Sequence, residues 1–224
     1  RLTRNGKFID DDLAHAPEAG MIFSFGDQFI EKGDVFELEK IVSIYTTREK
    51  RNPLIESLVG VKSAGTFDEL LNDSVKAQKK LWKEINIQID GDRQSQKLMR
   101  LHLYHLLISA SRHNEKLDAS VTARGLHGEA YRGHIFWDEL FILPFYDIHY
   151  PKTARSLLMY RYRRLDKARE YAKAHGYKGA MYPWQSGSDG REETQVVHLN
   201  PVTGEWGPDH SSLQRHISLA VAYD

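Results

Sequence analysis

The residues from Pro151 to Gly176 read PKTARSLLMYRYRRLDKAREYAKAHG, and this stretch decides the class of the fold. Its apolar side chains recur at the spacing of one helix face, and they are Ala154, Leu157, Leu158, Leu165, Ala168 and Ala172. Pro151 suits the first turn of a helix, and His175 with Gly176 suits its end. The pattern therefore predicts one helix over the whole stretch.

Helical spacing continues on both sides of this stretch. Upstream, Thr66-Phe67-Asp68-Glu69 has the pattern of a capping box, in which the Thr and Glu side chains bond backbone amides at the start of a helix. The stripe that this helix should bury consists of Phe67, Leu70, Leu71, Val75 and Trp82. A second helix is predicted from about Arg93 to His113, with apolar residues around most of its circumference and hence burial on more than one side. A further helical pattern begins near Leu213 and continues to the last residues.

Residues 1 to about 50 have the pattern of β-strands instead. Met21–Phe25 is a short apolar run, and the side chains from Val35 to Tyr45 alternate between two faces of a strand, one of them mostly apolar. Ile85–Ile89 alternates in the same way and is predicted as another short strand. These strands are too few for an independent β domain, so we expect the remainder of the sheet upstream of Arg1.

Two long connections, residues 118–150 and 177–212, separate the predicted helices. The first is rich in polar and aromatic side chains, and the second is rich in Gly, Ser and Asp. Loops of such length inside a compact domain usually carry function. Successive helices joined by long loops favour a mainly α fold, an α/α toroid whose loops build a pocket.

The composition narrows the classes of function. The 224 residues contain 31 basic side chains (Lys and Arg) and 31 acidic ones, and this balance indicates neither a nucleic-acid partner nor an acidic membrane surface. Cys is absent, which excludes disulfides, thiolate metal sites and a Cys nucleophile. No apolar run has the length of a membrane span. The compartment stays open between cytoplasm and periplasm.

The densest group of chemically active side chains lies between Arg124 and Glu139. This first segment reads RGLHGEAYRGHIFWDE. Its mixture suits a sugar site, because an aromatic ring stacks on a pyranose while carboxylates and Arg bond its hydroxyls. A second segment, Tyr182–Thr194, repeats the chemistry with an aromatic, an amide, hydroxyls and the acids Glu192 and Glu193. An ordinary ordered loop for the first segment and a solvated acidic turn for the second are the alternatives.

Metal and nucleotide sites have weaker patterns. His127-Gly128-Glu129 lacks the Cys pair of zinc deaminases, and His102 with His105 on an apolar helix favours hydrogen-bonded core residues. No Walker A sequence occurs, and the glycines of the first segment do not follow a strand at the dinucleotide-binding spacing. We therefore expect no metal and no cofactor. Arg161–Arg164 is basic, but nearby acids favour a solvated helix face.

Three motifs resemble glycoside hydrolase family 65. They are GEAYRGHIFWD at Gly128–Asp138, LLMYRYRRLDKAR at Leu157–Arg169 and GYKGAMYPW at Gly176–Trp184. The resemblance covers about residues 65–224 and implies an N-terminal β-sandwich, a linker and an (α/α)6 barrel. The parts that it implies for this chain are residues 1–50 as the C-terminal part of the β-sandwich, 51–92 as a helical linker and 93–224 as the N-terminal part of the catalytic domain.

The same resemblance implies an inverting enzyme that acts on α-linked glucose disaccharides such as maltose, trehalose or kojibiose. Trp137 and Asp138 would bind the glucosyl unit, and Arg132, Trp184 and Gln185 would lie in or near the same pocket. The general acid of the family lies on a later loop of the barrel. We therefore expect no catalytic residue within this chain, and we expect the chain alone to be an inactive fragment.

The residues after the Trp-Asp pair favour a hydrolase. Many phosphorylases read FWDTE, whereas this chain reads FWDELF from Phe136, and Trp184–Thr194 is more similar to the hydrolytic branch. A phosphorylase that uses inorganic phosphate as co-substrate is the alternative within the family. A non-catalytic carbohydrate-binding module is the alternative from another class. The sequence leaves the cleaved linkage open and is compatible with a homodimer.

Overall fold

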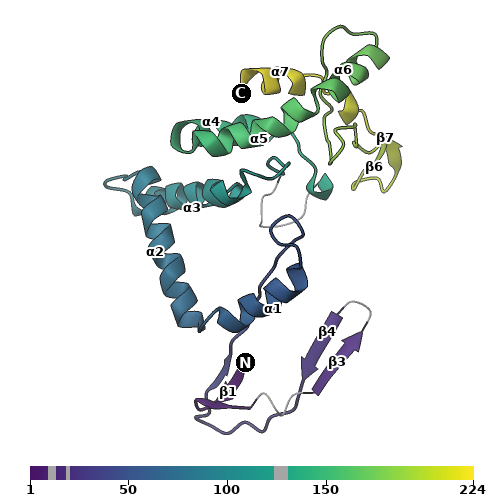
Figure 1. Ribbon diagram of the computed structural model, residues 1–224. Helices are drawn as coiled ribbons and strands as arrows, with labels where there is room; N and C mark the ends of the chain where they lie inside the picture. The colour runs from purple at the N-terminus through teal and green to yellow at the C-terminus, as the bar shows by residue number, and fades with distance from the viewer. Residues whose placement is uncertain (10–13, 19–20, 124–130) are drawn as a thin grey trace. The chain divides into compact units, whose positions relative to one another are not determined.

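The computed structural model describes residues 1–9, 14–18, 21–123 and 131–224 (Figure 1). The chain divides into two compact units, Arg1–Leu81 and Trp82–Asp224. Arg124, His127 and Glu129 of the first predicted site segment lie outside the described residues. The architecture is mainly α, as the helical spacing predicts.

The described residues contain helices and short antiparallel strands joined by turns and loops. The helices are α1 (Pro53–Ser63), α2 (Phe67–Ile85), α3 (Arg93–Ser109), α4 (Glu139–His149), α5 (Pro151–Arg163), α6 (Leu165–Ala174) and α7 (Ile217–Tyr223). The strands are β1 (Leu2–Arg4), β2 (Lys7–Phe8), β3 (Ala14–Glu18), β4 (Met21–Phe25), β5 (Phe36–Leu38), β6 (Val197–Leu199) and β7 (Trp206–Pro208). β1 lies between β2 and β5 in one sheet, whereas β3 with β4 and β6 with β7 form hairpins.

The strand predicted at Met21–Phe25 is confirmed as β4, but the longer strand predicted from Val35 to Tyr45 is wrong. Within it only β5 pairs, with β1, and Val42 and Ile44 are 65% and 82% exposed. Alternation marks a face that a sheet can bury, but a strand also needs a neighbour for its backbone hydrogen bonds. Within this stretch, among the described residues, only β5 has such a neighbour, which is β1.

α2 begins with the capping box that the sequence predicts. The Thr66 backbone N–H donates to the Glu69 carboxylate (2.8 Å), and the Glu69 N–H donates to the Thr66 hydroxyl (3.3 Å). The predicted burial of its apolar stripe is wrong, because Phe67 and Leu71 are 56% and 47% exposed. Helical spacing identifies the apolar face of a helix, but burial depends on what packs against that face.

α3 differs from its prediction in length and in burial. It begins where the Asp92 side chain accepts a hydrogen bond from the Gln94 N–H (2.9 Å), and it ends at Ser109 instead of His113. Of its described residues only Leu103 is buried, so burial on more than one side is wrong within this chain. The strand predicted at Ile85–Ile89 is also wrong, because Ile85 is the last residue of α2.

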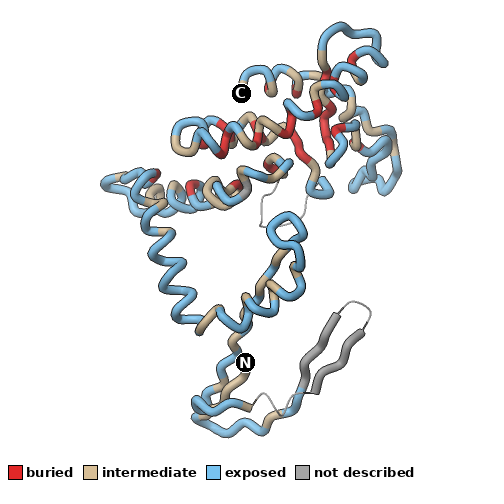
Figure 2. Tube along the Cα trace, viewed as in Figure 1, coloured by how far each residue is buried: buried red, intermediate tan, exposed pale blue. Residues whose placement is uncertain are grey.

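α4 lies inside residues 118–150, which the composition predicts as a loop. The helix starts directly after Asp138 and contains Pro144, a residue that helix patterns rarely include. Tertiary burial stabilises it, because Leu143 and Tyr146 are almost fully buried. These side chains belong to the core cluster Ala110, Val121, Leu143, Tyr146, Ala154 and Leu157, which joins α4 to α5. Figure 2 shows buried residues, in red, along both helices.

The predicted helix over Pro151–Gly176 is divided into α5 and α6. The break is at Arg164, whose φ of −106° and ψ of 12° leave the helical region. The Arg164 guanidinium donates to Asp118 (2.9 Å) and to the Ser188 carbonyl, so a tertiary contact replaces helix continuity. The predicted stripe is buried at Ala154, Leu157, Ala168 and Ala172, and the chain turns with a φ of +79° at Gly176.

Candidate functional site

Two loops of the second unit are joined by a short antiparallel bridge. The Ile135 N–H donates to the Ser186 carbonyl (2.9 Å), and the Ser186 N–H donates to the Ile135 carbonyl (3.0 Å). The bridge therefore places Phe136 and Trp137 of one loop beside Trp184 and Gln185 of the other. The two segments that the sequence singles out as chemically active thus meet at one place.

A buried arginine lies beneath both loops. The Arg161 side chain is 2% exposed, and its Nε donates to the Glu139 carboxylate (2.8 Å). Its other nitrogens reach the Phe136 carbonyl (3.2 Å) and the Ser186 hydroxyl (3.5 Å). The predicted solvated helix face is therefore wrong for Arg161, and also for Arg164, because both bind loop carbonyls. A single guanidinium can satisfy several acceptors from different segments, which suits it to this position.

Aromatic rings cover the bridge. Phe136 and Trp184 meet edge to face at 4.7 Å between ring centroids, and Trp137 lies 5.7 Å from Trp184. Tyr131 stacks on Phe136 at 4.6 Å. His216, at the start of α7, contacts both tryptophans. Offset and edge-to-face pairs of this kind hold ring orientation as well as burying apolar area.

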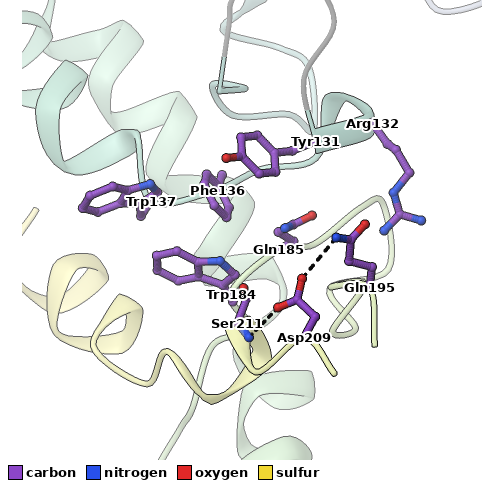
Figure 3. Close-up of a pocket in the computed structure, with 9 residues that line it drawn as sticks. All are labelled: Tyr131, Arg132, Phe136, Trp137, Trp184, Gln185, Gln195, Asp209 and Ser211. Atoms are coloured by element: carbon purple, nitrogen blue, oxygen red, sulfur yellow. Dashed lines mark hydrogen bonds between the residues drawn. The ribbon is translucent and has the colours of Figure 1, made fainter. Parts of the chain in front are cut away.

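A cavity of about 420 Å³ opens beside these rings (Figure 3). Its lining residues are Tyr131, Arg132, Phe136, Trp137, Trp184, Gln185, Gln195, Asp209 and Ser211. The two tryptophans lie on one side, and Arg132 and Gln195 lie on the other (Figure 3). The size lies in the range of small-molecule sites. Four of the five residues predicted to bind ligand, namely Arg132, Trp137, Trp184 and Gln185, therefore line one cavity.

Asp138, the fifth predicted residue, follows Trp137 in the chain and precedes the first residue of α4. Its side chain makes no capping bond to the helix, and its Oδ2 is buried without a hydrogen-bond partner. Burial raises the pKa of this carboxyl above its ordinary value. A buried acceptor without a partner is unfavourable unless a ligand supplies a donor. The predicted role of Asp138 in binding remains a prediction, and its unpartnered oxygen is compatible with it.

Arg132 lies in a turn of unusual backbone geometry. Tyr131, Arg132 and Gly133 have φ angles of 51°, 55° and 67°, the left-handed region that favours glycine. Each such angle at a residue other than glycine costs about 1–3 kcal/mol, and such residues cluster at functional sites. The Arg132 guanidinium donates to the Glu193 carbonyl, and the Tyr131 ring stacks on Phe136. These contacts hold the turn at the rim of the cavity.

Three lining residues, Gln195, Asp209 and Ser211, are missing from the sequence prediction. Asp209 accepts hydrogen bonds from the Gln195 amide (3.1 Å) and from the Ser211 N–H (2.8 Å), and the bonds from Ser211 lower the pKa of its carboxyl. Gln195 and Asp209 flank the β6–β7 hairpin, whose pairing brings distant residues together. The length of the connection over 177–212 indicates function, but only the hairpin pairing identifies these residues.

The described residues contain neither a metal-binding cluster nor a membrane-spanning helix. Among the described residues, no group of three or more His, Asp or Glu side chains could hold a metal ion. In that same part of the chain, no helix is long and apolar enough to cross a membrane. The polar groups at the cavity are instead an arginine, two amides, two hydroxyls and a carboxylate, which suit a ligand with many hydroxyls.

Comparison with known proteins agrees with the geometry. The sequence model for the glycosyl hydrolase family 65 central catalytic domain matches residues 100–224. An uncharacterized glycosyl hydrolase of Mycobacterium tuberculosis is 48% identical over all of the chain. A trehalose 6-phosphate phosphorylase of Lactococcus lactis is 44% identical over 87% of it, and a kojibiose phosphorylase of Caldanaerobacter subterraneus is 41% identical over 86%.

The chain spans only part of these relatives. It covers 17% of the length of the mycobacterial protein, 26% of the trehalose 6-phosphate phosphorylase and 25% of the kojibiose phosphorylase. A solved structure from the human microbiome, described as a candidate kojibiose phosphorylase, matches 86% of the chain and 26% of its own with a TM-score of 0.61 at 24% identity. That likeness supports the fold, a partial helical barrel. The chain therefore belongs to glycosyl hydrolase family 65.

Proposed function

We propose that this chain is the sugar-positioning part of an inverting enzyme that cleaves an α-linked glucose disaccharide with inorganic phosphate as co-substrate. The observation that carries the proposal is the cavity in which Trp137 and Trp184 lie opposite Arg132, with the unpartnered Oδ2 of Asp138 next in the chain to Trp137. A pyranose presents an apolar C–H face and a rim of hydroxyls. Aromatic rings suit the first, and an arginine, amides and a carboxylate suit the second.

The carboxylates near the cavity differ in whether the protein already supplies their hydrogen-bond partners. Glu139 is bound by Arg161, and Asp209 by Gln195 and Ser211. Glu192 accepts backbone hydrogen bonds. The buried Oδ2 of Asp138 has no hydrogen-bond partner, and we assign it to a substrate hydroxyl. An inverting enzyme needs an acid on one side of the glycosidic bond and a nucleophile on the other. We therefore assign Asp138 to substrate binding. We expect the general acid on a later loop of the barrel, after Asp224.

Phosphorolysis is favoured over hydrolysis by the relatives whose names state an activity. The proteins from Lactococcus lactis and Caldanaerobacter subterraneus are both named as phosphorylases. Hydrolysis is the second candidate, because the shorter FWDELF sequence from Phe136 departs from the phosphorylase pattern. The two reactions share the glucosyl pocket and differ in the group that attacks the anomeric carbon.

The test uses the full-length protein that contains this sequence. It is incubated with maltose, trehalose, kojibiose, nigerose and trehalose 6-phosphate, each with and without inorganic phosphate. We expect β-glucose 1-phosphate to form from one of them only when phosphate is present. Glucose release at the same rate without phosphate would favour hydrolysis instead. Failure of every substrate under both conditions, with a folded protein, would contradict the proposed function.

A further inference from the structure

The segment that carries Trp184 and Gln185 has little regular structure of its own. Residues 181–187 belong to no helix or strand. The Met181 and Tyr182 N–H groups bond the Ala168 carbonyl and the Ser218 hydroxyl, and the bridge fixes Ser186. Both side chains nevertheless line the cavity, and both are more than nine-tenths buried. Some other interaction must hold the backbone of these two residues.

Glu192 supplies that interaction. Its Oε2 accepts a hydrogen bond from the Trp184 N–H (2.7 Å), and its Oε1 accepts one from the Gln185 N–H (3.2 Å). The Thr194 N–H (3.0 Å) and the Thr194 hydroxyl also donate to Oε1. Four donors therefore converge on one carboxylate. Among the described residues no Lys, Arg or His forms an ion pair with it, so neutral donors satisfy the charge.

The same short segment contacts the other side of the cavity. The Glu193 N–H donates to the Gln185 carbonyl (3.0 Å), and the Glu193 carbonyl accepts from the Arg132 guanidinium. The Gln185 side chain, whose backbone Glu192 holds, lies 3.4 Å from the His134 ring nitrogen. Three cavity residues from two distant parts of the sequence thus depend on residues 192–194.

We infer that Glu192 is a positioning residue, which holds the indole of Trp184 and the amide of Gln185 in the orientation that binds the glucosyl unit. This inference rests on the proposed function. A carboxylate that accepts backbone N–H groups forms bonds about twice as strong as those of a neutral acceptor. Glutamine at this position turns one acceptor oxygen into an amide that points at a donor. Glu192→Gln therefore removes the charge and creates a mismatch, although it has the same size.

The experiment measures binding and stability separately in the full-length protein. Binding of glucose is followed by isothermal titration calorimetry, which needs no fluorescent reporter. Glucose is titrated at a temperature far below the unfolding transition, and the KM for the preferred disaccharide is measured. We expect Glu192→Gln to raise both the Kd for glucose and the KM by about tenfold or more, a change that corresponds to the loss of one charged hydrogen bond.

Glu170→Gln is the matched control. It makes the same chemical change on α6, where Glu170 is exposed and, among the described residues, pairs with Lys167 (2.8 Å). We expect its Kd and KM to equal those of the parent. If Glu192→Gln lowers the Tm but leaves the Kd and KM unchanged, Glu192 is only structural and the inference is overturned. A parent protein that neither binds glucose nor turns over a disaccharide contradicts the proposed function instead.

A second variant covers the case in which Glu192→Gln does not fold. Thr194→Val removes the hydroxyl donor to Oε1 and keeps both the carboxylate and the backbone donors. We expect a rise of about two- to threefold in the Kd for glucose, because one of the four bonds is lost. An unchanged Kd in this variant overturns the inference.

Discussion

The two units of the chain differ in how much of their side-chain surface they bury. Among the described side chains of Arg1–Leu81 none is buried, and apolar residues such as Leu54 and Phe67 are more than half exposed. In Trp82–Asp224 even an arginine and a glutamate are almost fully buried. The first unit keeps its helices through local signals such as the capping box. The second depends on contacts between residues far apart in the sequence, and it is there that the cavity forms.

Removing Arg161 is the strongest test of this difference in burial between the two units. We expect it to cause the largest loss of stability. Arg161→Met leaves Glu139 buried without its partner and frees two loop acceptors. Breaking such a pair costs about 3–5 kcal/mol. Chemical unfolding measures the change.

Two further variants check the physical reason. Arg161→Met combined with Glu139→Gln should recover part of the lost stability, because no charge remains buried alone. Arg169→Met removes an exposed ion pair with Asp166 and should have almost no effect. Equal losses in Arg161→Met and Arg169→Met would show that the buried pair does not support the second unit.

The next largest effect is on activity. Asp138→Asn should lower kcat/KM by about a hundredfold, because the carboxylate is assigned to a substrate hydroxyl. Its stability should rise slightly at neutral pH. The pKa of Asp138 is raised in the folded protein, so folding favours its protonated form and stability falls as pH rises from the unfolded value through the folded one. Because asparagine does not ionise, Asp138→Asn removes this loss of folding stability. Unchanged kinetics would contradict the assignment.

A smaller effect is expected in the core of the second unit. The Tyr146 hydroxyl accepts from the Ala110 N–H (3.1 Å) and lies 2.6 Å from the Leu106 carbonyl, and burial raises its pKa to about 12. Tyr146→Phe leaves the Ala110 N–H without its partner and should cost about 1–3 kcal/mol. Thermal unfolding measures the change. Tyr162→Phe on the exposed face of α5 is the control, with no loss expected.

The smallest effect is expected in the first unit. Leu70→Ala shortens a side chain on α2 that is 41% exposed, so the unfolding free energy should change by less than about 0.5 kcal/mol. Thr66→Ala removes the helix cap and should cost about 1 kcal/mol. The loss of stability should thus be larger for Thr66→Ala than for Leu70→Ala. If the apolar stripe of α2 were buried, the order would be reversed. A larger loss for Leu70→Ala than for Thr66→Ala would show that the stripe is covered.

Local patterns predict local features of this chain well. The capping box at Thr66, the buried stripe of α5 and α6 and the turn at Gly176 are all present. Each depends on residues within a few positions of one another. The break at Arg164 could not be predicted in this way, because it follows from bonds to Asp118 and Ser188.

The residues of the site also divide into those that local sequence identifies and those that only tertiary pairing brings to the cavity. Arg132, Trp137, Trp184 and Gln185 lie in two segments of recognisable composition, and the structure brings them to one cavity. Gln195, Asp209 and Ser211 have ordinary loop composition and join the cavity only through the β6–β7 hairpin. A sequence pattern identifies residues with suitable chemistry, but it does not say which distant loops will meet.

Glu192 binds the main chain and not the side chains of Trp184 and Gln185. Every residue except proline carries the N–H group that it needs. Substitutions at these two positions therefore keep the backbone frame while changing the surface offered to a ligand. A library that varies position 185 with Glu192 fixed can change sugar preference without rebuilding the loop.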